Sequence, residues 1–148
     1  MKKFLSLFLL LTLIKSTTMA ETDYQNNKVM AIMEDLYKSS KMINSTYCNG
    51  DYSNGLKLVE CSFYPLCEYV YEYETVEGFK NALDNRIFQR ILLSSNFSNP
   101  DMKNFLYELI VVNATLRYKY MSPDGEYFTI DFDYEELMDI MDSIYPDE

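Results

Sequence analysis

The chain of 148 residues carries 13 lysine and arginine residues against 23 aspartate and glutamate residues, has no histidine, and bears a formal net charge of −10. The absence of histidine excludes Ser-His-Asp triads, Cys-His dyads and imidazole-based zinc, haem or copper sites. The acidic charge, with no basic cluster in the body of the chain, argues against binding to nucleic acid. The length fits a single domain.

The N-terminal segment has the three zones of a secretory signal peptide. Two lysines precede an apolar run over residues 4–14, and two small residues, Thr18 and Ala20, end the segment. The apolar run, about eleven residues, is shorter than the roughly twenty residues that a membrane-spanning helix needs. We therefore expect residues 1–20 to be cleaved. Residues 21–148 would then form one exported, soluble domain, periplasmic or extracellular, with no membrane insertion.

The next segments predict a helix followed by two strands. From Asp23 onward, apolar residues recur at the three-and-four spacing of an amphipathic helix. The stretch 44–55 contains two Asn-Gly steps and no periodicity, which predicts a loop. Residues 56–63 and 67–74 are rich in β-formers and flank Pro65, so they predict two antiparallel strands.

Two helices are expected after these strands. Thr75 can cap the first, whose expected buried stripe consists of Val76, Phe79, Leu83, Ile87 and Ile91. The second helix is short. Asn99 is its expected cap, Pro100 occupies the first helical position, and its apolar residues extend to Leu109.

The last third of the chain gives the clearest pattern. Residues 112–120 and 127–132 alternate between apolar and polar residues around a Ser-Pro-Asp-Gly turn, which predicts a β-hairpin. Asp133 and Glu136 have the spacing of a capping box before a closing helix that reaches Ile144. The expected fold is therefore α+β: a four-stranded, mostly antiparallel sheet built from two β-hairpins with helices packed on one face, in the order α-β-β-α-α-β-β-α.

Three cysteines in an exported chain predict one disulfide and one remaining thiol. Cys61 and Cys67 lie symmetrically about Tyr64 in the proposed hairpin, so they could face one another. Cys48 could instead pair with either of them and fix the preceding loop to the sheet. The spacing matches no CxxC motif, and the lack of histidine argues against a nucleophilic cysteine.

Three tyrosines on one face of the second strand, Tyr69, Tyr71 and Tyr73, are candidates for partner binding. The simplest interpretation is that a helix covers their rings. They could also form a protein interface or a platform for sugar rings.

The C-terminal helix provides a second candidate surface. Its acidic residues follow helical spacing: Glu135, Glu136, Asp139 and Asp142. Such residues are typical of a solvated helix face, and they would also attract a cationic partner. A calcium site would need carboxylates converging from a loop, so metal binding is not expected.

These exclusions predict a non-catalytic, exported binding domain. Its charge favours a protein partner with a basic surface, as for an inhibitor or immunity protein that binds a cationic enzyme. The alternative is a carrier of a small apolar ligand, with a pocket of roughly several hundred cubic ångströms between the sheet and the N-terminal helix. A pair of carboxylates could support glycosidase chemistry, but the spacing singles out no pair. No catalytic residue and no cofactor are expected.

Overall fold

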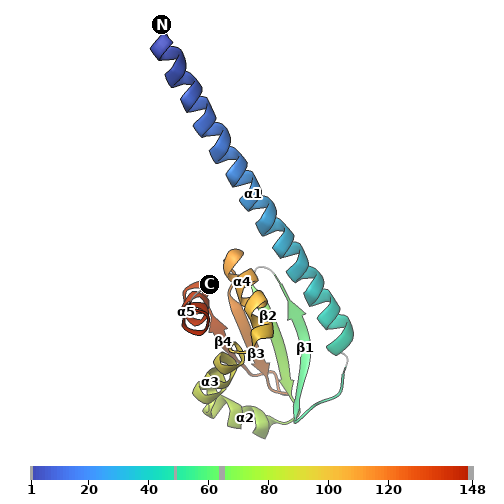
Figure 1. Ribbon diagram of the computed structural model, residues 1–148. Helices are drawn as coiled ribbons and strands as arrows, with labels where there is room; N and C mark the ends of the chain where they lie inside the picture. Colours follow the sequence, from blue (N-terminus) through green and yellow to red (C-terminus); the bar gives the residue numbers. More distant parts are fainter. Residues whose placement is uncertain (1, 49, 64–65, 147–148) are drawn as a thin grey trace. The chain divides into compact units, whose positions relative to one another are not determined.

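The computed structural model describes residues 2–48, 50–63 and 66–146, with side chains described from residue 24 onward (Figure 1). It divides into two compact units, residues 1–34 and residues 35–148. The first unit consists of the N-terminal part of helix α1 (Lys2–Tyr47). The side chains at the expected cleavage site lie outside the described residues, so cleavage stays a prediction.

The second unit contains a four-stranded sheet in the order β1-β2-β3-β4. The strands are β1 (Leu56–Ser62), β2 (Cys67–Tyr73), β3 (Leu116–Met121) and β4 (Tyr127–Phe132). The pairs β1/β2 and β3/β4 are antiparallel hairpins, whereas β2 and β3 pair in parallel. A parallel pair needs a crossover connection, and the helices between β2 and β3 supply it.

The remaining helices are α2 (Val76–Asp84), α3 (Arg86–Asn96), the 3-10 helix η1 (Pro100–Met102), α4 (Lys103–Val111) and α5 (Tyr134–Ile144). The helices of this unit pack on one side of the sheet (Figure 1). The predicted α+β class, element order and helix placement are therefore confirmed. Among the described residues, no helix combines the length and apolarity required to cross a bilayer.

The hydrophobic core lies between the helices and the sheet. Seven large side chains there are almost completely buried: Phe79, Phe97, Phe132, Leu106, Leu109, Leu116 and Leu137. The predicted caps hold the helices around this core. The Asp133 carboxylate accepts a hydrogen bond from the Glu136 amide at 3.0 Å, and the Glu136 carboxylate accepts one from the Asp133 amide at 3.2 Å. The two bonds complete the expected capping box.

Helix α1 continues to Tyr47, through residues that were expected to begin a loop. The Asn44 side chain explains the extension. Its amide donates to the Cys61 carbonyl at 2.6 Å, and its oxygen accepts from the Cys61 amide at 2.7 Å. These two bonds to β1 outweigh the weak helix propensity of asparagine.

The expected disulfide is absent from the structure, in which Cys48, Cys61 and Cys67 are all free thiols. The hairpin register explains why the proposed Cys61–Cys67 pairing was wrong. Cys61 lies opposite Tyr69, so the two cysteines do not face one another across the strands. The turn residues on which the prediction was centred, Tyr64 and Pro65, lie outside the described residues.

The single helix expected after Thr75 is two helices, because α2 ends and α3 begins at Asn85. Thr75 does cap α2, accepting a hydrogen bond from the Gly78 amide at 3.1 Å. The expected buried stripe is correct at Phe79, which is 1% exposed, but wrong at Ile87, which is 75% exposed. The change of direction at Asn85 therefore turns the second half of the stripe outward.

Candidate functional site

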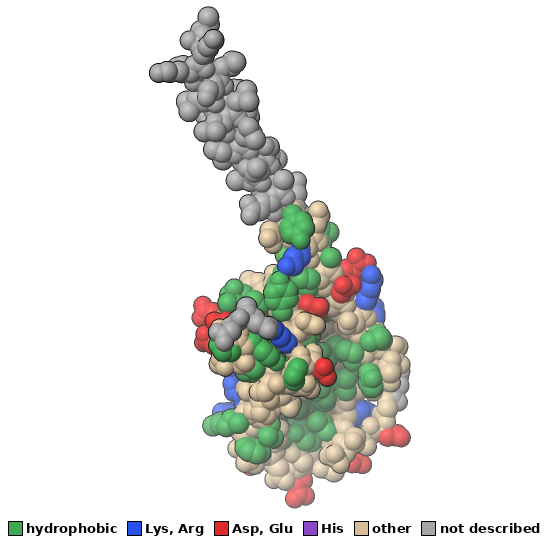
Figure 2. Space-filling model, viewed as in Figure 1, with side chains coloured by type: hydrophobic (Ala, Val, Ile, Leu, Met, Phe, Trp, Pro, Cys, Tyr) green, Lys and Arg blue, Asp and Glu red, His purple; other side chains and the backbone are tan. Residues whose placement is uncertain are grey.

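Helix α3 presents its apolar side to solvent. Four large apolar residues on one side of this helix are exposed, and we call them the α3 patch: Ile87 (75% exposed), Phe88 (57%), Ile91 (59%) and Leu92 (44%). No residue of α3 is fully buried. Since an amphipathic helix normally turns its apolar side to the core, α3 is inverted. Figure 2 shows apolar side chains projecting at the lower left, over the position of α3 in Figure 1.

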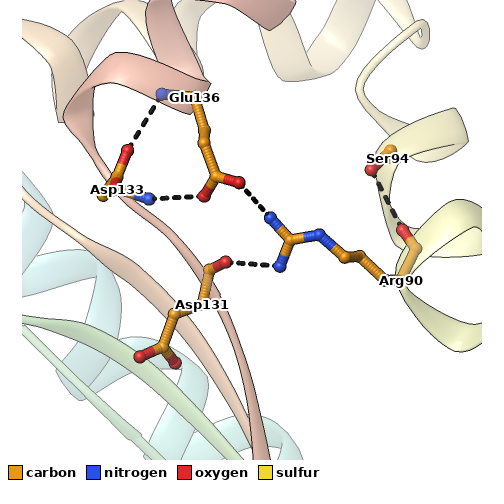
Figure 3. Close-up of polar contacts among 5 residues, drawn as sticks. All are labelled: Arg90, Ser94, Asp131, Asp133 and Glu136. Carbon is orange, nitrogen blue, oxygen red and sulfur yellow. Dashed lines mark hydrogen bonds and ion pairs between the residues drawn. The ribbon is translucent and has the colours of Figure 1, made fainter. Parts of the chain in front are cut away.

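The half-buried side of α3 includes a charged residue, Arg90, which attaches the helix to β4 and α5 (Figure 3). One guanidinium nitrogen donates to the backbone carbonyl of Asp131 at 2.7 Å, and another forms an ion pair with the carboxylate of Glu136. The guanidinium carbon lies 4.5 Å from the centre of the Phe132 ring. Arg90 therefore joins three elements and fixes the orientation that leaves the α3 patch exposed.

We expect Arg90→Ala to lower the free energy of unfolding by about 1–2 kcal/mol, because it removes a charge-assisted hydrogen bond, an ion pair and a cation–π contact that are all partly solvated. Arg90→Lys should recover only part of this loss, because the lysine ammonium group lacks the planar guanidinium whose two nitrogens bond Asp131 and Glu136 at the same time. Urea unfolding followed by circular dichroism measures both changes. Arg86 is the control, because it forms no ion pair with any residue that the structure describes. Equal losses for Arg86→Ala and Arg90→Ala would contradict this account.

A groove of about 590 Å³ separates α3 from β4 and the start of α5. It is lined by Arg86, Ile87, Arg90, Thr129, Ile130, Asp131 and Glu136. A smaller depression of about 260 Å³, which also includes Arg90 and Glu136, extends between Ser94 and Asp139. The opposite side of α3 has a second groove of about 430 Å³, which includes Tyr73 and Phe88. Helix α3 is thus a ridge with an apolar surface and a groove on each side.

The predicted tyrosines lie on the side of the sheet that the helices cover, and all three are half-buried. Tyr69 stacks on Tyr118 with ring centres 5.7 Å apart, and Tyr71 stacks on Tyr120 at 5.6 Å. Burial raises the pKa of Tyr69 and Tyr71 above the ordinary phenol value. Of the three, Tyr73 reaches a groove beside the α3 patch.

The predicted acidic residues of α5 have different environments. Glu136 is half-buried and holds Arg90, whereas Glu135, Asp139 and Asp142 are exposed. Asp139 lines the depression next to Arg90. The structure therefore places two of the four predicted acids, Glu136 and Asp139, beside α3.

The cavity between α1 and the sheet is smaller than the ligand-carrier alternative predicts. It measures about 130 Å³ and includes Leu36, Cys61, Cys67, Tyr69 and Phe105. Pockets for small molecules usually span roughly 300–1,000 Å³. In the part of the chain that the structure describes, no group of three or more His, Cys, Asp or Glu residues could hold a metal ion.

Sequence reasoning did not find the α3 patch, because it assigned Ile87 and Ile91 to a buried stripe. One sequence feature could have indicated it. Between Asp84 and Asp101 the chain has two arginines and no acidic residue, although the protein as a whole has a net charge of −10. An apolar and locally basic helix within an acidic chain is unusual for a solvated surface.

Comparison with known proteins identifies the fold. No protein-family model matches the sequence, and no curated protein matches it. A solved structure of a protein from Pseudomonas aeruginosa that is predicted to be secreted is 12% identical, with a TM-score of 0.59 over 74% of this chain and 96% of that one. The structure of EpsS, the pilotin of the Vibrio vulnificus type 2 secretion system, is 11% identical, with a TM-score of 0.56 over 76% and 96%. The α+β fold described above is thus similar to the folds of these two proteins.

Proposed function

We propose that this protein is an exported, non-catalytic binding domain that docks a partner protein on the α3 patch. The exposure of Ile87, Phe88, Ile91 and Leu92 on one helix is the observation that carries the proposal. Large apolar side chains that are exposed side by side form the kind of contiguous patch that often marks a protein interaction site. Burial against a partner would recover the hydrophobic free energy that α3 does not gain within this chain.

Three further observations support this proposal. The N-terminal segment has the features of an export signal. One protein of similar fold is predicted to be secreted, and the other is a secretion-system pilotin. The cavity beneath α1, about 130 Å³, is too small to favour the ligand-carrier alternative.

The exposed acidic residues of α5 favour a partner with basic residues on the part of its contact surface that lies opposite α5. Glu135, Asp139 and Asp142 are exposed on α5, and Asp139 lines the depression next to α3. Rim charges of this kind mainly speed association and select the partner, whereas the apolar centre supplies most of the affinity.

Site-specific photo-crosslinking in the cells that produce the protein tests the proposal. A benzophenone amino acid replaces Phe88 in the patch or, as the control, Tyr47 on α1, which is 63% exposed. We expect ultraviolet light to join position 88, but not position 47, to one distinct protein, which mass spectrometry then identifies. Protein adducts that are absent from position 88, or equal at both positions, would overturn the proposal.

A further inference from the structure

The two edges of the sheet differ in how their backbone groups are satisfied. On the free edge of β1, Leu56 exchanges two backbone hydrogen bonds with Ser53, at 2.9 and 3.1 Å. Further along this edge, the Asn44 side chain bonds both the amide and the carbonyl of Cys61. The β1–β2 register also shifts between Leu58 and Glu60. Bulges and covering groups of this kind are the usual protection of an edge strand.

The free edge of β4 has much less protection. Hydrogen-bonded pairs alternate along an antiparallel ladder. Ser122 donates to Glu126 at 2.8 Å just before the strands, so the backbone groups of Tyr127, Thr129 and Asp131 point away from β3. Arg90 confirms this direction, because it reaches the Asp131 carbonyl from outside the sheet.

The other outward backbone groups of β4 belong to Tyr127 and Thr129. No hydrogen bond to the outward backbone groups of Tyr127 or Thr129 is present among the described residues. Strand β4 contains no lysine, no proline and no register shift against β3. Thr129 instead lines the 590 Å³ groove together with Arg86 and Ile87.

We infer that the partner binds through an extended segment that adds to the sheet as a new strand beside β4, with its apolar side chains against Ile87, the residue of the α3 patch that lines the groove beside β4. This inference rests on the proposed function and specifies how the docking occurs. An added strand would bond the outward groups of Tyr127 and Thr129. Arg86, one helical turn before Arg90, is placed to donate to a carbonyl of that strand, as Arg90 does to Asp131.

The unpaired edge favours an extended segment over a helix, because the backbone groups of a helix are already bonded to each other. The charge favours another protein over a second copy, since two copies with a net charge of −10 each would repel one another. The expected segment has apolar residues at every second position, which would face α3, and few acidic residues.

Selection from a phage library of random ten-residue peptides against the purified protein tests this inference. Synthetic versions of the enriched peptides are then titrated against three variants. Thr129→Pro removes one outward amide without breaking the ladder to β3, since proline is tolerated on the solvent side of an edge strand. Thr129→Ala is the matched control and keeps that amide. Ile91→Glu changes the α3 patch.

We expect Thr129→Pro to weaken binding at least tenfold, Thr129→Ala to change it less than threefold, and Ile91→Glu to weaken it at least tenfold. Peptides that are N-methylated at alternate residues provide a second measurement, which does not depend on the folding of the proline variant. Methylation at either the odd or the even positions should abolish binding, and methylation at the other set should preserve it. The reason is that only every second amide of an added strand faces β4.

The other outcomes are also informative. Ile91→Glu could prevent binding while Thr129→Pro binds the peptides as tightly as the unchanged protein and both sets of methylated peptides bind equally well. Strand addition would then be wrong, and the proposed docking on α3 would still stand. If bound peptides are insensitive to both Thr129→Pro and Ile91→Glu, the inference and the proposed docking surface both fail. An absence of enriched peptides, or a dimer in sedimentation analysis that Thr129→Pro dissociates, would overturn the inference.

Discussion

Replacing Phe79 by alanine is expected to lower the free energy of unfolding by about 3–5 kcal/mol, whereas Phe88→Ala should change it by no more than about 0.5 kcal/mol. The two phenylalanines lie on successive helices but in opposite environments. Phe79 is 1% exposed and lies between the rings of Tyr73, at 6.3 Å, and Phe128, at 5.6 Å. Phe88 is 57% exposed.

Urea unfolding of both variants, followed by circular dichroism, measures this difference. Each substitution removes the same atoms from a helix, so differences in residue type and helix propensity cancel between the two variants. A loss of several kcal/mol in both would show that the α3 patch is packed against the protein in solution. The inverted orientation of α3 would then be wrong.

The second large effect is expected at alkaline pH. Burial is the main cause that raises the pKa of the Cys61 thiol to about 11 and that of the Cys67 thiol to about 12. In the unfolded chain both thiols ionise near their ordinary value of 9.0. Between pH 9 and the raised pKa of each thiol, the unfolded state releases a proton that the folded state retains. The free energy of unfolding therefore falls as the pH rises through this range.

Each thiol should contribute a loss of up to about 1.4 kcal/mol per pH unit above pH 9, and no loss below it. Partial or complete burial also raises the pKa values of the Tyr69, Tyr118 and Tyr120 phenols, and they should extend the decline to higher pH. Urea unfolding at pH 7, 9 and 10.5 measures the slope. The Cys67→Ala variant should show a smaller slope between pH 9 and 10.5, and an unchanged slope in this variant would contradict the burial of a titrating thiol at this position.

The parts of the fold that could be predicted depend on short stretches of sequence. The β3–β4 hairpin follows from strict alternation around a Pro-Asp-Gly turn, and the capping box of α5 follows from the spacing of Asp133 and Glu136. The same reasoning failed where distant residues decide the outcome. The extension of α1 depends on a bond between Asn44 and Cys61, and the orientation of α3 depends on contacts of Arg90 with Asp131 and Glu136.

The candidate site was harder to predict for the same reason. Phe79, Leu83, Ile87 and Ile91 continue one helical period through Asn85, so the sequence alone does not reveal a change of direction there. The side chains that were proposed for partner binding still bear on the site, since Tyr73, Glu136 and Asp139 lie in grooves beside α3. The sequence pattern did not reveal that the apolar side of α3, between these grooves, is exposed.

The most direct test of the proposed docking surface is the yield of the photo-crosslinked adduct from position 88 in two further variants. Ile91→Glu places a charge within the α3 patch, and Met42→Glu places the same charge on α1. The two native side chains are 59% and 61% exposed, so neither substitution should unfold the protein. We predict that Ile91→Glu lowers the adduct yield at least tenfold and that Met42→Glu leaves it unchanged. Equal yields in the two variants would contradict docking on the α3 patch.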